Sequence, residues 1–251
     1  MKRLPSWTYS VIGVVGVVLL WQLVAVTLFT PHSVPTPTAI ARHMIDDGGS
    51  FYWRNATTTM SAAAKGWLWG NALAVGLALL VLITPVIEGP LMQLGITSYC
   101  LPIVAIGPIF AVVFNGETPK VVLAALSVFF VTLVGTLLGL RSAEQASLDV
   151  VHAYGGGSWQ KLTKVRLRAS LPSVFAALRI ASPAAILGAI IGEYLGADRG
   201  LGVAMITSEQ QLNVPRTWAI ALVATFAAGI AYALTALVGR LLTPWAPRSP
   251  S

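Results

Sequence analysis

Glu193 is the side chain whose chemistry most needs an explanation in this sequence. It is the one acidic residue deep within a long apolar segment, and it lies between Gly192 and Gly196. A carboxylate in that setting is costly unless it is paired or hydrated. Two interpretations stay open: Glu193 is a gate or pathway residue for transport, or it is an interfacial acid that pairs with Arg199 or with a neighbouring helix end.

The other reactive residue types form no catalytic or metal-binding pattern. No pair of catalytic acids or nucleophile motif stands out, and the histidines, His32, His43 and His152, lack metal-ligand spacing. Gly155-Gly156-Gly157 is not followed by the Gly-Lys pair of a phosphate-binding loop. The lone Cys100 excludes an intrachain disulfide and is expected to be buried. We therefore expect no catalytic residue, no metal and no cofactor in this chain, and no enzyme activity of its own.

A cationic segment with a glycine run, residues 141–172, is the second feature that indicates a binding function. Residues 144–153 favour a helix, the glycines break it, and Ser158 can cap a second short helix over residues 159–167. That second helix would present Trp159 and two aliphatic side chains on one face. Two short helices around a glycine turn can fill a groove on a partner protein. Alternatively, the segment is a basic amphipathic surface that rests on anionic lipid headgroups.

The elements that must position these residues are long apolar segments. The chain is 56% hydrophobic and 10% charged, against about 25% charged in an ordinary soluble domain. A hydrocarbon core about 30 Å thick takes roughly 20 apolar residues in a helix to cross. Segments of that length lie near residues 9–29, 62–83, 91–114, 121–140, 173–195 and 218–242. The sequence thus predicts a single domain over residues 1–251, an all-α, polytopic membrane bundle of about six transmembrane helices.

The positions of Lys and Arg predict which side of the membrane each loop faces. Cytoplasmic loops carry the excess of these residues, and the densest cluster lies within 141–172. Both termini are then cytoplasmic, and the net charge of +7 mainly reports topology. The first apolar run is longer than the about 7 to 15 residues of a signal peptide, so we expect it to stay as a span. Nucleic acid is not an expected partner, because the basic residues are not interleaved with aromatics on a soluble domain.

Small residues and prolines predict how the spans pack and bend. Glycines four residues apart form flat stripes that let helices approach closely in lipid. These are Gly66/Gly70, Gly135/Gly139 and Gly188/Gly192/Gly196. Pro102 and Pro108 lie inside the third span, where each removes a helical hydrogen bond and kinks the helix. Before the second span, Thr36 and Pro37 favour the start of a short helix over residues 39–45 on the outer membrane surface.

The most specific motif lies in the cationic segment. Asp149-Val150-Val151 stands where a Glu-Ala-Ala is usual, Gly155 follows after three residues, and Leu171-Pro172 supplies a later Leu-Pro pair. This pattern resembles the signature loop of bacterial ABC importer permeases, with Leu167-Arg168 in place of an earlier Leu-Pro of many members. Further similar stretches are 102–108, 129–130, 177–181 and 192–202. The set is similar to the branch that imports nitrate, taurine, aliphatic sulfonates and thiamine-precursor pyrimidines.

The resemblance implies a type I ABC importer-like fold with a cytoplasmic coupling-helix loop at residues 141–172. It implies a homodimeric or pseudo-dimeric pore made by two such permease subunits in the bacterial cytoplasmic membrane, with a homodimer as the expectation for this chain. An extracytoplasmic binding protein would deliver a small solute, and separate ATPase subunits would bind ATP-Mg and dock on the loop. The expected ATPase contacts are Asp149, Ala153, Gly155, Gly156, Gly157, Ser158, Trp159, Leu171 and Pro172.

Candidates for the pathway or a gate are Glu193, Pro102, Pro108 and Tyr99. The rival hypothesis is a stand-alone secondary transporter, in which Glu193 couples transport to an ion or to the substrate. The sequence does not name the solute.

Overall fold

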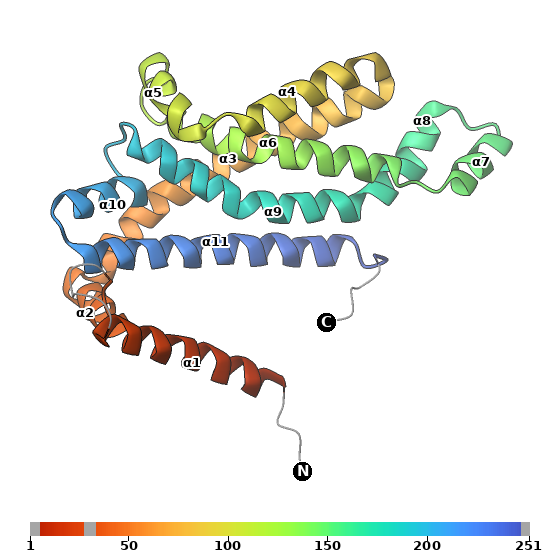
Figure 1. Ribbon diagram of the computed structural model, residues 1–251. Coiled ribbons are helices and arrows are strands. Elements are labelled where there is room, and N and C mark those ends of the chain that lie inside the picture. The colour runs from red at the N-terminus through yellow and green to blue at the C-terminus, as the bar shows by residue number, and fades with distance from the viewer. Residues whose placement is uncertain (1–5, 28–33, 247–251) are drawn as a thin grey trace, which may run out of the picture.

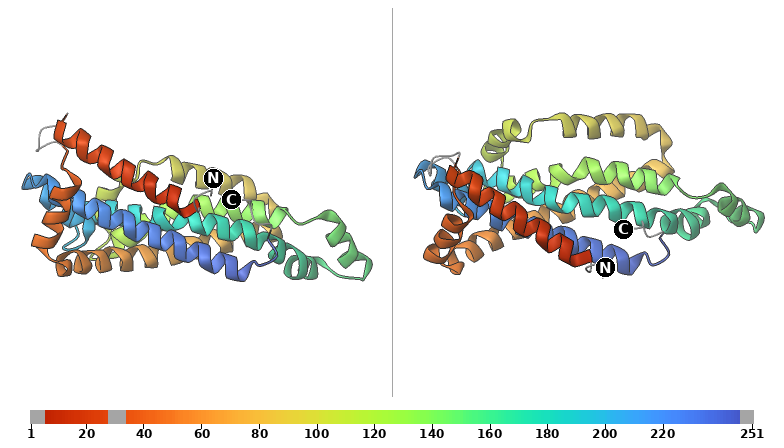
Figure 2. Two further views of the ribbon diagram at one scale, coloured as in Figure 1. Left: turned by 90° about the horizontal axis from the view of Figure 1, so that it is seen from below. Right: turned by 60° about the horizontal axis from the view of Figure 1, so that its bottom comes forward.

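The computed structural model describes residues 6–27 and 34–246, and every regular element within these ranges is a helix. The helices are α1 (Ser6–Thr27), α2 (Pro37–Asp47), α3 (Gly49–Ile83), η1 (Pro85–Ile87), α4 (Glu88–Cys100), α5 (Ile103–Val113), α6 (Thr118–Arg141), α7 (Gln145–Ala153), α8 (Ser158–Lys161), η2 (Leu162–Arg166), α9 (Leu167–Tyr194), α10 (Leu201–Gln210) and α11 (Val214–Leu242). The long helices run side by side, with α2 and α10 at one end and α7 and α8 at the other (Figures 1 and 2). We name these the outer end and the inner end, after the sides of the membrane that the sequence predicts for them.

Four of the described helices are long and apolar enough to cross a membrane. They are α3, α6, the continuous helix Ser158–Tyr194 and α11, and the bent pair formed by residues 85–113 makes a fifth span if it is counted as one. The apolar stretch described in α1, Val11–Thr27, is shorter than the others. The fold is thus the expected all-helical membrane bundle. Lys2, Arg3, His32, Arg248 and the last two residues of the expected first span lie outside the described residues.

The expected third span, residues 91–114, is two helices rather than one kinked helix. α4 and α5 meet at an angle of 97°. The break falls at Leu101 and Pro102, where Leu101 has an extended backbone with ψ 125°. The proline ring disfavours a helical conformation in the residue before it, which explains why the helix ends here. Pro108, by contrast, lies inside α5, and the helix continues through it.

The expected fifth span, residues 173–195, begins much earlier. One helix of 37 residues runs from Ser158 to Tyr194, through the π-helical turn η2. The second short helix expected over residues 159–167 is therefore not separate, because it is the first part of this helix. Pro172, which was expected to lead the span, lies in its interior.

The second span is also longer than its apolar part. α3 has 35 residues, or about 52 Å at 1.5 Å per residue, so its polar first turns continue beyond a hydrocarbon core. Ahead of it, the short outer helix forms as predicted. Thr36 caps it, because its hydroxyl accepts a hydrogen bond from the Ala39 N–H at 3.2 Å, and Pro37 is its first residue.

Small residues let α3, α6 and α9 approach closely at the centre of the bundle. A Cβ added at Gly70 would lie 2.6 Å from Val128 and 2.9 Å from the Ala125 Cα, and one at Gly139 would lie 2.9 Å from the Ser170 carbonyl oxygen. Gly66, Gly135, Gly188 and Gly192 are equally tight. The predicted stripes are thus packing surfaces. Gly196 is the exception, because it faces open space and has a φ of +138°.

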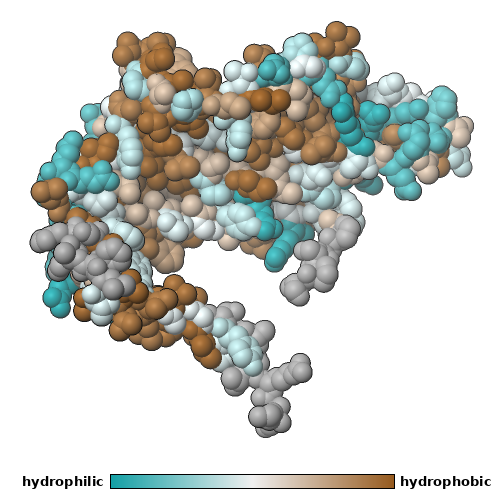
Figure 3. All heavy atoms as spheres, in the orientation of Figure 1, coloured by the Kyte–Doolittle hydropathy of each residue, from teal (hydrophilic) through white to brown (hydrophobic). Residues whose placement is uncertain are grey.

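Two parts of the chain pack little against the rest. α1 diverges from the bundle (Figure 1). Its outer half contacts α2, and the Trp21 ring lies 5.4 Å from that of Trp218, centroid to centroid. α4 is also largely exposed, and Cys100 at its end is exposed rather than buried as expected. Apolar atoms cover much of the face in Figure 3, as befits a surface that lipid or another protein covers.

Candidate functional site

The inner end carries a small knob made of α7, the glycine turn and the first residues of α8, and it projects beyond the bundle (Figure 1). Gly155 has a φ of +77°, a conformation that side-chain-bearing residues rarely adopt, and its N–H donates to the His152 carbonyl at 2.9 Å. The Gly156 N–H donates to the Val151 carbonyl at 2.8 Å. These bonds end α7 and reverse the chain. The glycine turn is therefore built as the sequence predicts.

The three glycines differ in what they require. Gly155 requires the left-handed backbone, whereas Gly156 is buried and a Cβ there would lie 2.6 Å from the Val151 carbonyl oxygen. Gly157 faces open space with φ −82°. It is also the N-cap of the following helix, where its N–H donates to the Gln160 side chain at 3.1 Å. The expectation that Ser158 caps this helix is wrong, because Ser158 is its first residue.

The surface of the knob is mixed in character. Tyr154 is 89% exposed and Trp159 71% exposed, although large aromatics are usually well covered in folded proteins. Asp149, Ala153, Gly155, Gly157 and Ser158 are exposed on the same knob. Leu171 and Pro172 are not part of it, because both lie further along the long helix in α9. The structure thus brings together all the expected coupling residues except that pair.

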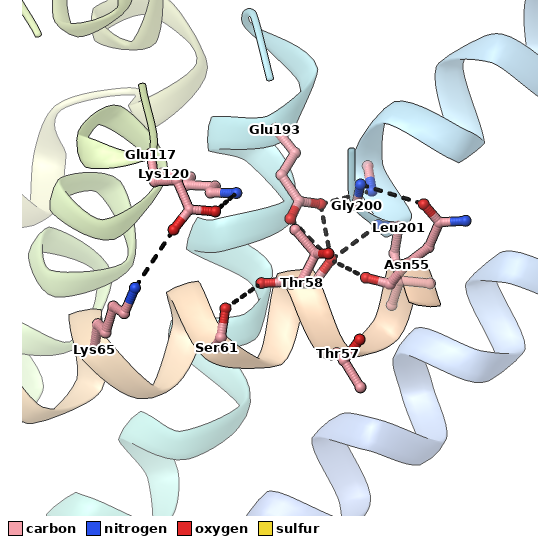
Figure 4. Close-up of polar contacts among 12 residues, drawn as sticks. Asn55, Thr57, Thr58, Ser61, Lys65, Glu117, Lys120, Glu193, Gly200 and Leu201 are labelled. Atoms are coloured by element: carbon pink, nitrogen blue, oxygen red, sulfur yellow. Dashed lines mark hydrogen bonds and ion pairs between the residues drawn. The ribbon is translucent and has the colours of Figure 1, made fainter. Parts of the chain in front are cut away.

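At the outer end, Glu193 lies in a hydrogen-bond network between three helices (Figure 4). Its side chain is fully buried, and both carboxylate oxygens lie 2.9 Å from the Thr59 hydroxyl of α3. One of them also accepts the Gly202 N–H at 2.9 Å. The Leu201 N–H donates to the Thr59 hydroxyl at 2.8 Å. Glu193 therefore holds the N-terminal end of α10 against α3 and α9.

This network bears on the second interpretation of Glu193, the pairing with a neighbouring helix end or with Arg199. The Gly200 N–H donates to the Asn55 side chain at 3.4 Å, so three successive N–H groups at the start of α10 have side-chain acceptors. Unpaired N–H groups at a helix start are costly when buried, and a carboxylate there also meets the positive end of the helix dipole. The expected pairing with a neighbouring helix end is confirmed. The pairing with Arg199 is wrong, because Arg199 is exposed and forms no ion pair within the described residues.

Two glycines make room for the carboxylate. A Cβ at Gly200 would overlap the Glu193 carboxyl group, and Gly200 also has a φ of +138°. A Cβ at Gly202 would lie 2.8 Å from the Glu193 Cβ. The Gly-Leu-Gly that follows Arg199 in the sequence is thus the signal that something packs closely there. No local signal points to Thr59 or Asn55, whose side chains belong to an ordinary helical stretch.

Two groups of charged residues at this end are paired with one another. Lys120 is buried and binds Glu117 at 2.9 Å, while Lys65 approaches the same carboxylate at 3.4 Å (Figure 4). The hydrogen bond from Lys120 holds the pKa of Glu117 below its ordinary value. On the other side of the outer end, Asp47 pairs with Arg216 of α11. The hydrogen bond from Arg216 lowers the pKa of Asp47 in the same way.

The other candidates for the pathway do not meet at Glu193. Tyr99 is 66% exposed, and its ring lies 5.1 Å from that of Phe130. Pro102 lies at the break between α4 and α5, and Pro108 lies inside α5. These residues belong to the poorly covered part of the chain, whereas Glu193 is enclosed by its own helices. Among the described residues, no group of three His, Cys, Asp or Glu could hold a metal ion.

Comparison with known proteins bears on what the inner knob and the bundle do together. Residues 70–248, which include both the knob and Glu193, match the family described as the inner membrane component of binding-protein-dependent transport systems. The chain belongs to this family. As a permease it is also similar to individual members along most of its length.

Three relatives illustrate the similarity. A probable ABC transporter permease protein of Haemophilus influenzae is 32% identical over 84% of this chain and 86% of its own. The formylaminopyrimidine transport permease protein ThiX of Halalkalibacterium halodurans is 27% identical over 98% of both chains. The taurine transport system permease protein TauC of Escherichia coli is 26% identical over 93% of this chain and 88% of its own. The protein is therefore an ABC importer permease subunit, and a stand-alone secondary transporter fits these findings less well.

Proposed function

We propose that this permease forms, with a second copy, the membrane pathway of an importer whose ATPase subunits dock on the α7–α8 knob. The observation that carries the proposal is the exposure of Tyr154 and Trp159 on either side of the glycine turn at the inner end. Such side chains are typical of the centres of protein interfaces. The knob matches the loop that the family uses for this purpose, although its Leu171 and Pro172 lie behind it in α9.

The charges support an orientation with the knob in the cytoplasm of a bacterial cell. Five Lys and Arg residues lie between positions 141 and 168, and of these Arg141 alone forms an ion pair within the described residues, with Glu88. The described Lys and Arg residues at the outer end are spread thinly over several segments: Arg42, Arg54, Lys65, Lys120, Arg199 and Arg216. Because cytoplasmic loops carry the excess of Lys and Arg, both ends of the chain would also be cytoplasmic.

The poorly covered helices support a second copy of the chain. α1 and α4 leave long apolar faces without a partner in the single chain, and Tyr99 is exposed on one of them. A homodimer would cover part of this surface and place a pathway between the subunits. The Glu193 carboxylate already accepts hydrogen bonds from α3 and from the start of α10. This engagement supports the importer over a transporter in which Glu193 couples transport to an ion.

The energy source and the solute complete the proposal. ATP-Mg would be bound and hydrolysed by the partner ATPase and not by this chain, which lacks a phosphate-binding loop. An extracytoplasmic binding protein would select the solute and deliver it to the outer end. The relatives are named for formylaminopyrimidine and taurine, so a small polar solute is the class that we propose here.

Reconstitution in proteoliposomes tests the proposal. We expect uptake of the solute only when this permease, its ATPase, its binding protein and internal ATP-Mg are all present. Omission of the ATPase should abolish uptake even when a proton or sodium gradient is applied. Uptake that a gradient drives in the absence of the ATPase would show a secondary transporter and overturn the proposal.

A further inference from the structure

A cavity lies between α9 and α11 in the inner half of the bundle, and of the expected ATPase contacts Pro172 alone lines it. Its volume is about 550 Å³, within the range of small-molecule sites. Arg179 of α9 and Arg240 of α11 line it, together with Phe175, Thr235 and Thr243. None of its lining residues is acidic. Figure 3 shows hydrophilic atoms between α9 and α11 on a largely apolar face.

Arg179 lies well inside the span and not at its edge. Gly139, two residues before the end of α6, packs on Ser170. Arg179 follows Ser170 by nine residues, which is about 14 Å along a helix. Charged residues at such depth are rare, and they face a bundle interior or a water-filled cavity when they occur. Arg179 is therefore placed where a charge needs a partner.

The guanidinium of Arg179 has an orienting contact but no counter-charge. It lies 4.4 Å from the centroid of the Tyr232 ring and hydrogen-bonds the Tyr232 hydroxyl. Neither Arg179 nor Arg240 forms an ion pair among the described residues. A guanidinium carries five N–H donors in a planar fork, so most donors of both arginines stay free for another group.

The threonine hydroxyls that line the cavity have hydrogen-bond partners of their own, so the arginines are its main donors for a ligand. Thr235 donates to the Ala231 carbonyl at 2.9 Å, and Thr243 donates to the Gly239 carbonyl at 2.7 Å. The Thr235 hydroxyl also lies 2.7 Å from the Ser182 hydroxyl of α9, so both threonines have hydrogen-bond partners within the chain. A ligand of this cavity must accept hydrogen bonds from two guanidinium groups and carry negative charge. Planar forks of this kind match the oxygens of a phosphate, sulfonate or carboxylate group.

We propose that Arg179 and Arg240 form a binding site for an oxyanion in the cavity between α9 and α11. The oxyanion has two possible sources with the same chemistry. One is the phosphate of an anionic lipid headgroup, since basic pockets between spans on the cytoplasmic side bind such groups. The other is a soluble solute that carries a sulfonate or phosphate group. The site lies apart from the knob itself, although Pro172, an expected ATPase contact, is one of its lining residues.

Stability measurements on the full-length protein in lipid nanodiscs test the site. The midpoint of thermal unfolding is compared in phosphatidylcholine alone, in phosphatidylcholine with phosphatidylglycerol, and in phosphatidylcholine with added methanesulfonate or inorganic phosphate against chloride at equal ionic strength. The variant is Arg179→Gln/Arg240→Gln. The matched control is Arg54→Gln/Arg199→Gln, which removes the same charge from exposed outer-end arginines that do not line the cavity.

We expect an upward shift of the wild-type midpoint with one of the two ligands, absent in the cavity variant and retained in the control. A shift with phosphatidylglycerol alone assigns the site to a lipid, and a shift with methanesulfonate or phosphate assigns it to a soluble anion. No shift with either ligand, or equal loss in the control, would overturn the proposal. If the Gln variant does not fold, Arg179→Lys/Arg240→Lys is measured instead. Loss of the planar guanidinium groups should weaken oxyanion binding about tenfold. Unchanged affinity in that variant would also overturn the proposal.

Discussion

At the scale of single residues, the Glu193 carboxylate holds backbone and hydroxyl donors at the start of α10, and substitutions can separate this positioning from a role of its charge in transport. Replacing Glu193 with Leu removes the acceptor of the Gly202 N–H and of the Thr59 hydroxyl. We expect the free energy of unfolding to fall by about 1–3 kcal/mol for each stranded group. Glu193→Gln keeps a carbonyl oxygen for Gly202 and should cost less, while transport falls and assembly with the ATPase persists. Chemical denaturation and proteoliposome uptake measure the two effects.

The comparison between the two variants decides the role of this side chain. Thr59→Val provides a control, since it removes the hydroxyl from the same network and should resemble a mild form of Glu193→Leu. If Glu193→Gln transports at the wild-type rate, the charge has no part in transport and Glu193 is a structural tie. Equal stability of Glu193→Leu and the wild type would contradict the network itself.

The Asp47–Arg216 pair makes the outer end sensitive to acid. The pKa of Asp47 is lowered from its ordinary value of 3.8 by the hydrogen bond from Arg216. The folded state therefore binds the proton less tightly than the unfolded state does. The stabilisation is complete above the ordinary value and is lost as pH falls through the lowered folded value. We expect the unfolding midpoint of the wild type to fall in this range, and Asp47→Asn to remove that part of the pH dependence.

The control for this prediction is Asp46→Asn. Asp46 is its exposed neighbour and forms no ion pair among the described residues, so its removal should leave the acid dependence of the wild type in place. A pH profile of Asp47→Asn that overlays that of the wild type would show that the pair does not contribute.

At the scale of helices, close approach through glycine can be tested within α3 alone. A Cβ at Gly70 would meet the backbone of α6, whereas one at Gly76 meets nothing within 4 Å. We expect Gly70→Ala to destabilise the protein by about 1–3 kcal/mol through overpacking. Gly76→Ala should be neutral or stabilising by up to about 1 kcal/mol, because alanine favours the helix. Thermal unfolding of both variants gives the comparison, and equal behaviour would refute the packing argument.

The knob offers a second matched pair of glycines. Gly155→Val places a β-branched residue at φ +77°, whereas Gly157→Val places the same residue at φ −82° in open space. We expect the first variant to insert in the membrane but to lose transport and substrate-stimulated ATP hydrolysis. The second leaves the left-handed turn intact but adds a side chain to the proposed docking surface, so we expect a smaller loss of both than in the first. Measurement of coupled hydrolysis with the ATPase present separates the two, and full coupling in Gly155→Val would argue against the knob as the contact.

Hydrophobicity and spacing predicted the helical class, the tight glycine contacts and the glycine turn, because each of these depends on neighbouring residues. The ends of the long helices were not predictable in this way. The polar first turns of α3 and the joining of α8 to α9 have no apolar signal, and Pro102 could mark either a kink or a break. The contact between Glu193 and Thr59 joins residues 134 positions apart, and no local pattern in either helix indicates it.

At the scale of the whole molecule, the two ends should be accessible from opposite sides of the membrane. With Cys100→Ser as the background, since Cys100 is itself exposed, a cysteine at Lys161 should react only from the cytoplasmic side. A cysteine at Asp46 should react only from outside. Impermeant thiol reagents on intact cells and on inverted vesicles measure this. Reversed labelling would place the knob on the wrong side for an ATPase and would contradict the orientation.

The unbroken helix from Ser158 to Tyr194 has a mechanical consequence. Its 37 residues extend about 55 Å, so one stiff rod connects the glycine turn at the inner end with the carboxylate that anchors α10 at the outer end. We expect a displacement along the axis at Trp159 to reach Glu193 mainly through the backbone of this helix. The π-helical turn at Leu162–Arg166 and the interior prolines Pro172 and Pro183 are its irregular parts. Because each of them weakens the helical hydrogen bonding, they set how much of such a displacement is absorbed.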